Sequence, residues 1–365
     1  MLEVPYIASE YRLALKATMK KLSNIILIIL LISSLFMFHA NCGYGENNVK
    51  TEILIATNWG DKEGEFGVEK GGKTEKGYVL DFIINEKNIY ILDAINDRIQ
   101  IFDLNGKLKK IIDFEKKWEE FGVVWMFTLF QDNFYMLVGK PPYYGAVGIR
   151  EIHKISHDGK FIKSFGKEYI PRKQEDYYCY ILSDSNSDYL IGSIGDQKIL
   201  LFDAKEKMQY NILDLIEEKT FTYSLRGIDS YGNPIITKTN LDKNFLSTIV
   251  FDLKTKKIKN RAIGLFSAID SKNNFYSIRS TRLKIKNVKL HNANIVTMIT
   301  KYDPQKKSIN KFEVSGDVKV IKNGKEKLFR FKGNYSEISK VDPEGNIYHL
   351  IALEDGVLLR KITIK

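Results

Sequence analysis

The residues that could perform chemistry in this chain are few, and their spacing matches no known catalytic motif. His153 and His157 lie four positions apart. That spacing brings two metal ligands together on a helix, but the residues around them are typical of a β-strand and its turn. Cys42 and Cys179 are too few for a disulfide framework or a cysteine-based zinc site. The sequence also lacks a nucleophile elbow, a P-loop and a dinucleotide fingerprint. Binding is therefore favoured over catalysis, and whether the protein is an enzyme stays open.

Three groups of residues suit binding better. One is a stiff aromatic stretch, Pro-Pro-Tyr-Tyr, which either contacts a ligand or packs against a neighbouring part of the protein. The second is a segment rich in positive charge, which either attracts an anion or is a solvated hairpin. The third is an arginine flanked by leucine and glycine, which needs a partner or water. The candidate binding residues are Tyr143, Tyr144, Arg226, Arg279, Arg282 and Lys284.

The amino-terminal 45 residues predict export. A basic start at Met19 precedes the apolar run 25–38, which suits the core of a signal peptide and is short for a membrane-spanning helix. Residues 1–18 are interpreted as an upstream extension, residues 19–45 as the signal, and residues 46–365 as one domain. Simple cleavage, acylation of Cys42 as in bacterial lipoproteins, and a retained anchor remain alternatives. We expect an extracytoplasmic location: secreted, periplasmic or lipid-anchored.

The elements that would position these residues are short strands. Residues 79–114 contain four apolar or alternating runs separated by turns, and the third turn includes Asn105-Gly106, a strong hairpin signal. Four antiparallel strands in about 40 residues are typical of one propeller blade. The chain is 44% hydrophobic, which is ample for one large β domain.

Two turns recur along the chain and act as rulers for counting blades. Most copies are built from Asn, Asp, Gly and Ser, which tolerate positive φ and bond to the backbone. The first turn starts at Asn85, Gln131, Asp184, Asp229, Asp270 and Asp342, and the third turn at Asp103, Ser156, Asp203, Asp252 and Asp303. Six first turns predict six blades. The wide last gap allows a seventh blade, but an insertion is preferred.

An unpartnered strand at Thr51–Trp59 should close the ring. The last unit supplies only three strands, the final one at Val357–Lys365. Pairing between these two segments would complete the sixth blade and leave no long edge exposed.

The turns also predict two unlike faces. In an antiparallel blade the first and third turns lie on one face, here named the tight-turn face. The second turn and the link to the next blade lie on the opposite, long-loop face. All the long segments fall on the long-loop face: Gly60–Gly77, Gly139–Gly148, Gly166–Asp176, Arg279–Asn294 and Ser315–Asn334. Because binding residues concentrate on loops held by a rigid frame, the long-loop face is the expected working face.

The first blade carries a recognisable pattern. Asn88–Asp93 followed by Asn96-x-Arg98-Ile99-Gln100 and Gly106-Lys107 resembles the NHL-repeat and related TolB-like six-bladed propellers of exported bacterial proteins. That group includes scaffolds, RNA binders and some lyases or lactonases. The resemblance to lactonase propellers implies inward carboxylates that hold a divalent metal, and Asp81 and Glu337 are the residues that could serve.

The expected function is that of an extracytoplasmic binding or scaffold propeller. The net charge of +11 favours anionic partners. A protein, an anionic glycan or another cell-envelope component would meet the long-loop face. The export signal argues against nucleic acid, and we expect a monomer without a cofactor. The alternative is a metal-dependent enzyme of lactonase or lyase type.

Overall fold

A computed structural model of the chain places fifteen stretches of the sequence. It describes residues 49–68, 80–115, 123–139, 152–169, 178–183, 188–194, 198–216, 221–229, 231–240, 245–282, 295–315, 318–322, 325–329, 336–353 and 356–364. All statements below concern these residues.

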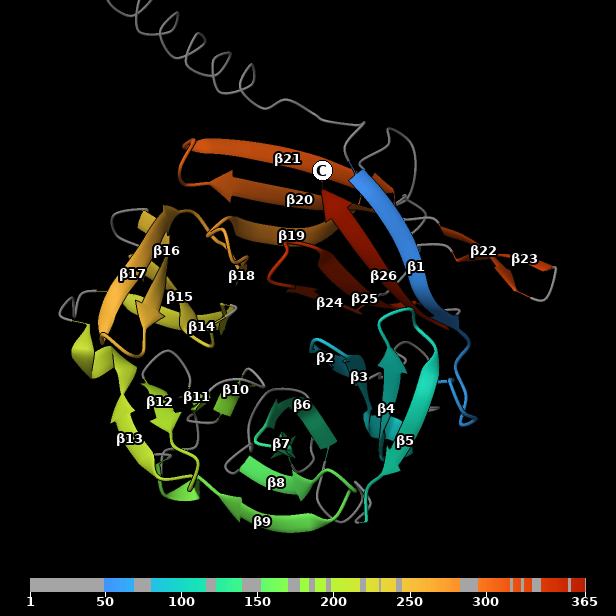
Figure 1. Cartoon of the computed structure of the whole chain (residues 1–365), viewed down its shortest axis with the longest axis horizontal. Helices are drawn as coiled ribbons and strands as arrows, with labels where there is room; N and C mark the ends of the chain where they lie inside the picture. Colours follow the sequence, from blue (N-terminus) through green and yellow to red (C-terminus); the bar gives the residue numbers. More distant parts are fainter. Residues whose placement is uncertain are drawn as a thin grey trace, which may run out of the picture.

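The strands form six four-stranded antiparallel sheets arranged in a ring, which confirms the six-bladed β-propeller (Figure 1). Blade 1 comprises β2 (Leu80–Ile84), β3 (Asn88–Asp93), β4 (Arg98–Asp103) and β5 (Leu108–Asp113). Blade 2 comprises β6 (Val123–Phe130), β7 (Asn133–Gly139), β8 (Ile152–Ser156) and β9 (Phe161–Phe165). Blade 3 comprises β10 (Tyr178–Leu182), β11 (Leu190–Ile194), β12 (Lys198–Phe202) and β13 (Met208–Asn211).

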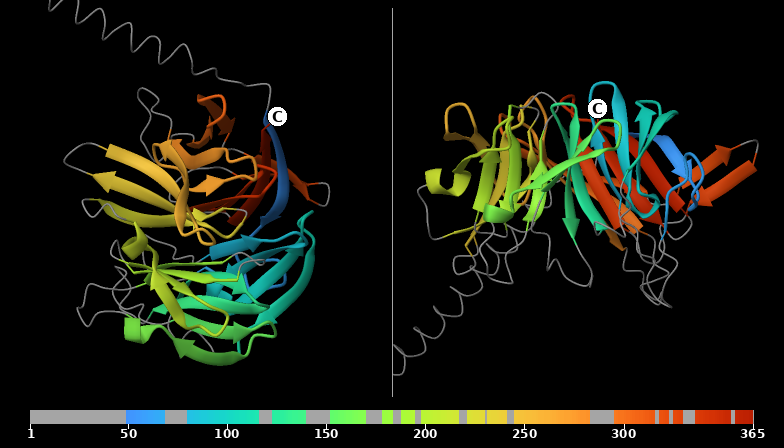
Figure 2. Two further views of the ribbon diagram at one scale, coloured as in Figure 1. Left: turned by 60° about the vertical axis from the view of Figure 1, so that its left-hand side comes forward. Right: turned by 90° about the horizontal axis from the view of Figure 1, so that it is seen from below.

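Blades 4 to 6 follow the same order, with the innermost strand first. Blade 4 comprises β14 (Thr222–Ile228), β15 (Pro234–Asn240), β16 (Phe245–Asp252) and β17 (Lys257–Ile263). Blade 5 comprises β18 (Ala268–Ile269), β19 (Phe275–Arg282), β20 (Ile295–Asp303) and β21 (Ser308–Ser315). Blade 6 comprises β24 (Ser336–Val341), β25 (Ile347–Leu353), β26 (Gly356–Ile364) and β1 (Val49–Thr57). The blades stand side by side when the disc is seen edge-on (Figure 2).

The ring closes as the sequence predicts. Strand β1 pairs antiparallel with β26, from Val49 opposite Ile364 to Thr57 opposite Val357, with one irregularity between Ile53 and Ile55. The amino-terminal strand is thus the outermost strand of blade 6. No long edge is left open at the seam.

The wide last gap holds an insertion and not a seventh blade. Strands β22 (Val318–Lys322) and β23 (Lys325–Phe329) form a separate two-stranded sheet. They lie beyond β1 at the rim of the disc (Figure 1). The predicted elements do not include this hairpin, although Asn323-Gly324 between its strands is a strong turn signal.

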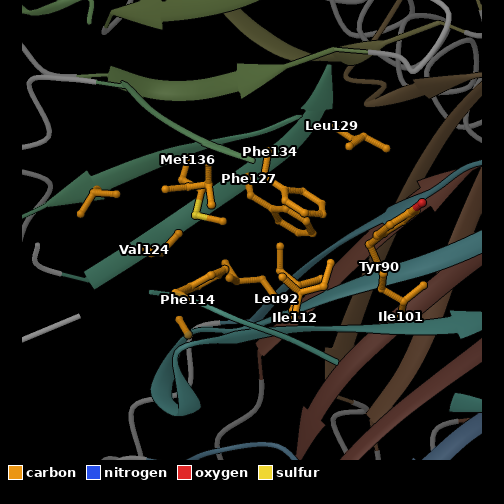
Figure 3. Close-up of a cluster of buried hydrophobic side chains, with 14 residues drawn as sticks. Tyr90, Leu92, Ile101, Ile112, Phe114, Val124, Phe127, Leu129, Phe134 and Met136 are labelled. Atoms are coloured by element: carbon orange, nitrogen blue, oxygen red, sulfur yellow. The ribbon is translucent and has the colours of Figure 1, made fainter. Parts of the chain in front are cut away.

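Apolar side chains between neighbouring blades form the core. Between blades 1 and 2, Tyr90 and Leu92 face Phe127 and Phe134 (Figure 3). The Phe134 ring lies 6.2 Å from that of Phe127 and meets Tyr90 edge-on at 6.1 Å. Fully burying each such side chain contributes about 1.5–3 kcal/mol. The core therefore fixes the blades against one another.

The tight turns follow their predicted chemistry. The carboxylate of Asp229 accepts the backbone N–H groups of Tyr231 and Asn233, and its other oxygen accepts the Asn233 amide. Asp270 with Asn274 and Asp342 with Asn346 repeat the arrangement. These side chains pre-form the turns.

Helix is confined to three short 3-10 turns among the described residues: η2 (Ala94–Asn96), η3 (Lys167–Tyr169) and η4 (Ile212–Leu215). In this part of the chain no helix has the length and apolar character needed to cross a membrane.

Candidate functional site

Asp81, a candidate metal ligand, joins two blades. It lies on innermost strand β2 and is buried. Its Oδ1 accepts the backbone N–H of Phe82 at 2.8 Å, and its Oδ2 accepts that of Phe127 in blade 2 at 3.1 Å. Burial raises the pKa of Asp81, while the charge of Lys340 and the two amides oppose that rise. The carboxylate is thus hydrogen-bonded to the backbone of blades 1 and 2.

Glu337, the second candidate metal ligand, lies in blade 6 and contacts the preceding blade, blade 5. It lies on β24, and its Oε1 accepts the backbone N–H of Ser280 in blade 5 at 2.7 Å. Its other oxygen accepts the Ser280 hydroxyl and lies 2.8 Å from Nε2 of His349. The inner neighbour of β19 is β18, which has only two residues, so Ser280 lies beyond the end of that ladder. Glu337 supplies the missing acceptor.

A buried polar chain continues from Glu337. His349 and Arg360 are both fully buried, and the guanidinium lies 3.2–3.3 Å from Nδ1 of His349 and donates to Oγ1 of Thr297 at 2.6 Å. Burial lowers the pKa of His349, and the charge of Arg360 adds to that effect. Burial also lowers the pKa of Arg360 to about 10. A neutral imidazole therefore accepts from arginine and donates to Glu337.

This chain of contacts ties blade 5 to blade 6 and resembles no nucleophilic triad. The Ser280 hydroxyl donates to the Glu337 carboxylate, and Nε2 of His349 contacts that carboxylate and not the hydroxyl, unlike the imidazole of a Ser-His-Asp triad. Asp81 accepts from blade 2 and lies 4.0 Å from Nζ of Lys340 on β24, whereas Glu337 contacts blade 5 and His349. Among the described residues no three His, Cys, Asp or Glu side chains are grouped as metal ligands.

Arg226 lies where a channel-facing residue would. It occupies the innermost strand of blade 4 at a register irregularity between Leu225 and Gly227, and its side chain is exposed. Its Nε donates to Oγ1 of Thr237 at 3.3 Å. A binding role for Arg226 stays a prediction.

The basic segment differs from its prediction in one respect. Arg279 and Arg282 do not lie in a loop, because β19 extends to Arg282 and pairs with β20 along its whole length. Arg279 is exposed and pairs with Met298. The alternation of residues 275–282 permits this longer strand, which simple counting of turns could not show. Tyr143, Tyr144, Lys284 and Cys42 lie outside the described residues.

The motif of the first blade binds the protein's own chain. Arg98 is buried and paired with Asp93, with Nε 2.8 Å from Oδ2. Its terminal nitrogens donate to the backbone carbonyls of Asp61, Lys62 and Glu65, each at 2.9 Å. Four of the five N–H groups of this guanidinium are therefore used within the chain.

Neighbouring residues complete this clamp on segment 60–67. Gln100 donates to the carbonyl of Glu65 and accepts from the N–H of Gly64. The Asn96 amide donates to the carbonyl of Gly60. Phe66 is fully buried, with its ring 6.3 Å from that of Phe102. The long-loop end of blade 1 is thus covered.

The long-loop end of blade 4 has a different surface, which the sequence analysis missed. Lys238 is 5% exposed, and its Nζ lies 3.8 Å from the centroid of the Phe221 ring and 5.7 Å from that of Phe245. The two rings meet edge-on at 5.7 Å. A cation over aromatic faces is attracted by the ring quadrupole.

Several apolar side chains at this end of blade 4 are exposed. Ile263 is 85% exposed, Leu265 43% and Phe245 39%. In the sheet register Ile263 is opposite Ser247, which is opposite Lys238. Alternation along β17 puts Arg261, which is exposed, on the face of Ile263. An isoleucine two positions from an arginine was the available signal, but only strand pairing brings in Lys238.

On the tight-turn face, by contrast, polar side chains form contacts between blades. Glu206, in the third turn of blade 3, lies 2.6 Å from Nζ of Lys154 and 2.8 Å from Nζ of Lys163, and accepts the Tyr135 hydroxyl at 2.7 Å. Burial opposes ionisation, but the two ammonium groups and the hydroxyl outweigh it, and the pKa of Glu206 is lowered. These contacts join blades 2 and 3.

Comparison with known proteins adds no function. No family model and no curated protein matches the chain. Similar solved structures include a Bacteroides fragilis protein assigned as exported (10% identity, 88% of this chain and 97% of that one, TM-score 0.44). Others are a DUF4221 family member from Bacteroides vulgatus (11%, 88% and 100%, 0.43) and a streptogramin B lyase (11%, 88% and 100%, 0.40). Such low similarity supports no inference about function, and the NHL-repeat resemblance of blade 1 stays a prediction.

Proposed function

We propose that this protein is an exported β-propeller that binds a partner through its long-loop face and performs no chemistry. The observation that carries the proposal is the group of exposed apolar side chains at the long-loop end of blade 4, with Ile263 85% exposed. Solvated apolar groups on a rigid frame are typical of interaction sites. The polar side chains of the tight-turn face, such as Glu206, serve contacts between blades.

The enzyme alternative lacks support from the residues that suggested it. Asp81 accepts a backbone N–H group of blade 2, and Glu337 accepts one of blade 5. The inferred signal at residues 19–45 supports an extracytoplasmic location. The partner is then a protein or an anionic glycan of the cell envelope, and nucleic acid is not expected. The protein would be a monomer whose membrane contact is limited to a lipid on Cys42.

Capture from a solubilised native envelope tests the working face. The immobilised protein should retain an envelope component, and retention should fall as salt rises, because exposed charges are screened within about 10 Å at about 0.1 M. Replacing Arg279, Arg282 and Lys284 together with serine should reduce capture. Matched serine changes at Lys205, Lys207, Lys254 and Lys256, on the tight-turn face, should not. The reverse outcome would contradict the proposal.

Export has its own test. Protein from the native cell should begin after residue 40, so amino-terminal sequencing that finds Met1 or Met19 would reject it. Labelling with a radioactive fatty acid, lost in Cys42→Ala, would establish the lipid anchor.

A further inference from the structure

One surface on the long-loop face combines exposed apolar groups with closely spaced cations. The blade 4 patch is defined here as Phe221, Lys238, Phe245, Arg261, Ile263 and Leu265. These residues come from three strands and two links that the sheet register brings together. Three of them are exposed large hydrophobic side chains.

The patch is held rigidly. Gly264 has φ of 120°, and its N–H donates to the carbonyl of Leu246 at 3.1 Å. The hydroxyl of buried Thr248 donates to the carbonyl of Gly264 at 2.8 Å and accepts the N–H of Phe266 at 3.0 Å. Ile263 and Leu265, on either side of Gly264, are therefore presented at fixed positions. Little ordering entropy opposes binding to such a surface.

The charges of the patch have one sign. Burial lowers the pKa of Lys238, and the charge of Arg261 adds to that effect. Burial raises the pKa of Tyr223, and the charge of Arg261 opposes that rise. Arg261 is exposed, so an anionic group of a partner can reach it.

We propose that the blade 4 patch docks an acidic segment of another protein, one that carries aliphatic or aromatic side chains beside its carboxylates. The inference rests on the proposed function and names its partner. The carboxylates would meet Arg261, which is exposed, and the apolar side chains would cover Ile263 and Leu265. An anionic glycan would leave Ile263 exposed and gain little from it.

Blade 1 shows that this face can hold a peptide segment. There Arg98 donates to three backbone carbonyls, and Phe66 anchors the segment in the core. The two contributions are a cation that meets polar atoms and apolar side chains that pack against the segment. The blade 4 patch has an exposed cation, Arg261, and exposed apolar side chains, Ile263 and Leu265.

The test uses the mature domain and fluorescent peptides whose binding is followed by polarisation. The probe alternates Glu or Asp with Leu or Phe. One matched peptide replaces the acids with Gln and Asn, and another replaces the apolar residues with Ser. A heparin fragment represents the glycan. We expect the probe to bind more tightly than either matched peptide and than heparin.

Variants then locate the site. Ile263→Ser combined with Leu265→Ser should weaken probe binding about tenfold, as loss of a central apolar contact does. Arg261→Gln should weaken binding of the acidic probe and leave the Gln/Asn peptide unchanged. The controls are Ile162→Ser, an isoleucine 47% exposed on β9, and Lys160→Gln in the third turn of blade 2. Neither control should change binding.

The outcomes separate this inference from the proposed function. Equal probe binding by the parent and the patch variants, or no probe binding by the parent, would overturn the docking site. Heparin binding that is tighter than probe binding and insensitive to Ile263→Ser would also overturn it, while leaving a long-loop-face binding protein in place. Envelope capture that depends on the tight-turn lysines would instead reject the proposed function.

Discussion

Blades 1 and 4 end differently on the same face of the disc. At blade 1 the cation Arg98 is paired with Asp93 and donates to three carbonyls of segment 60–67, and Phe66 fills the apolar space. At blade 4 Lys238 lies against two rings, and Ile263 is left in solvent. The comparison shows that a motif resembling a known pattern can serve to bind a segment of the same chain. In the proposal, the working surface lies on a blade that lacks this motif.

The largest expected effect is on the cation of blade 1. Arg98→Met removes the positive partner of the buried Asp93 carboxylate and the donor to the carbonyls of Asp61 and Lys62, so the free energy of unfolding should fall by about 3–5 kcal/mol. Chemical denaturation measures this. Arg279→Met, an exposed arginine on β19, is the matched control and should change stability by less than about 0.5 kcal/mol. Equal midpoints for the two variants would show that segment 60–67 is not clamped.

Truncation of Phe66 at blade 1 and of Ile263 at blade 4 should change the free energy of unfolding by amounts that differ almost as much. Phe66→Ala opens a cavity in a packed site and should cost about 3 kcal/mol, at the low end for such changes because the segment can settle. Ile263→Ala should stay within about 0.5 kcal/mol, because its side chain is already in water. Thermal unfolding of both variants provides the check. A large loss for Ile263→Ala would mean that another part of the chain covers the blade 4 patch.

A smaller effect is expected when the blade 4 cation is removed. Lys238→Met loses the attraction to Phe221 and Phe245 but also ends the desolvation of a charge. We expect the free energy of unfolding to change by less than about 1 kcal/mol. The same substitution thus has unlike outcomes at Arg98 and Lys238. A loss at Lys238 as large as that at Arg98 would remove the contrast between the blades.

The smallest effect is on pH dependence. Burial, and after it the charge of Arg261, lowers the pKa of Lys238 from its ordinary 10.5. Unfolding then takes up a proton between the lowered pKa and 10.5, so stability should rise as pH increases through that range. The difference in stability between the parent and Lys238→Met, measured across this range, isolates the contribution of one group. A flat difference would show that Lys238 titrates normally.

Much of the fold follows from local sequence. Asp229 with Asn233, and Asp342 with Asn346, mark turns because each carboxylate bonds the backbone of its own turn. The unpaired strand at the amino terminus could be matched to the last blade because six turns left one strand missing. Both inferences need only neighbours along the chain or simple counting.

The site could not be read in the same way. Lys238, Phe221 and Phe245 meet only through the pairing of their strands. Glu337 serves Ser280 because β18 stops after two residues, a length that no local pattern indicates. Long-range pairing decides both cases, and a single sequence does not display it.

The pairing of β1 with β26 also determines how the molecule can be attached to a support. Val49 lies opposite Ile364, and both belong to the tight-turn end of blade 6, because β1 reaches the long-loop end at Thr57. Chain entry and chain exit are therefore neighbours on one side of the disc. A tether at either end, whether a lipid, a surface or a sensor chip, holds the disc by its tight-turn side. The long-loop side then faces away from the support and is accessible to a partner in solution.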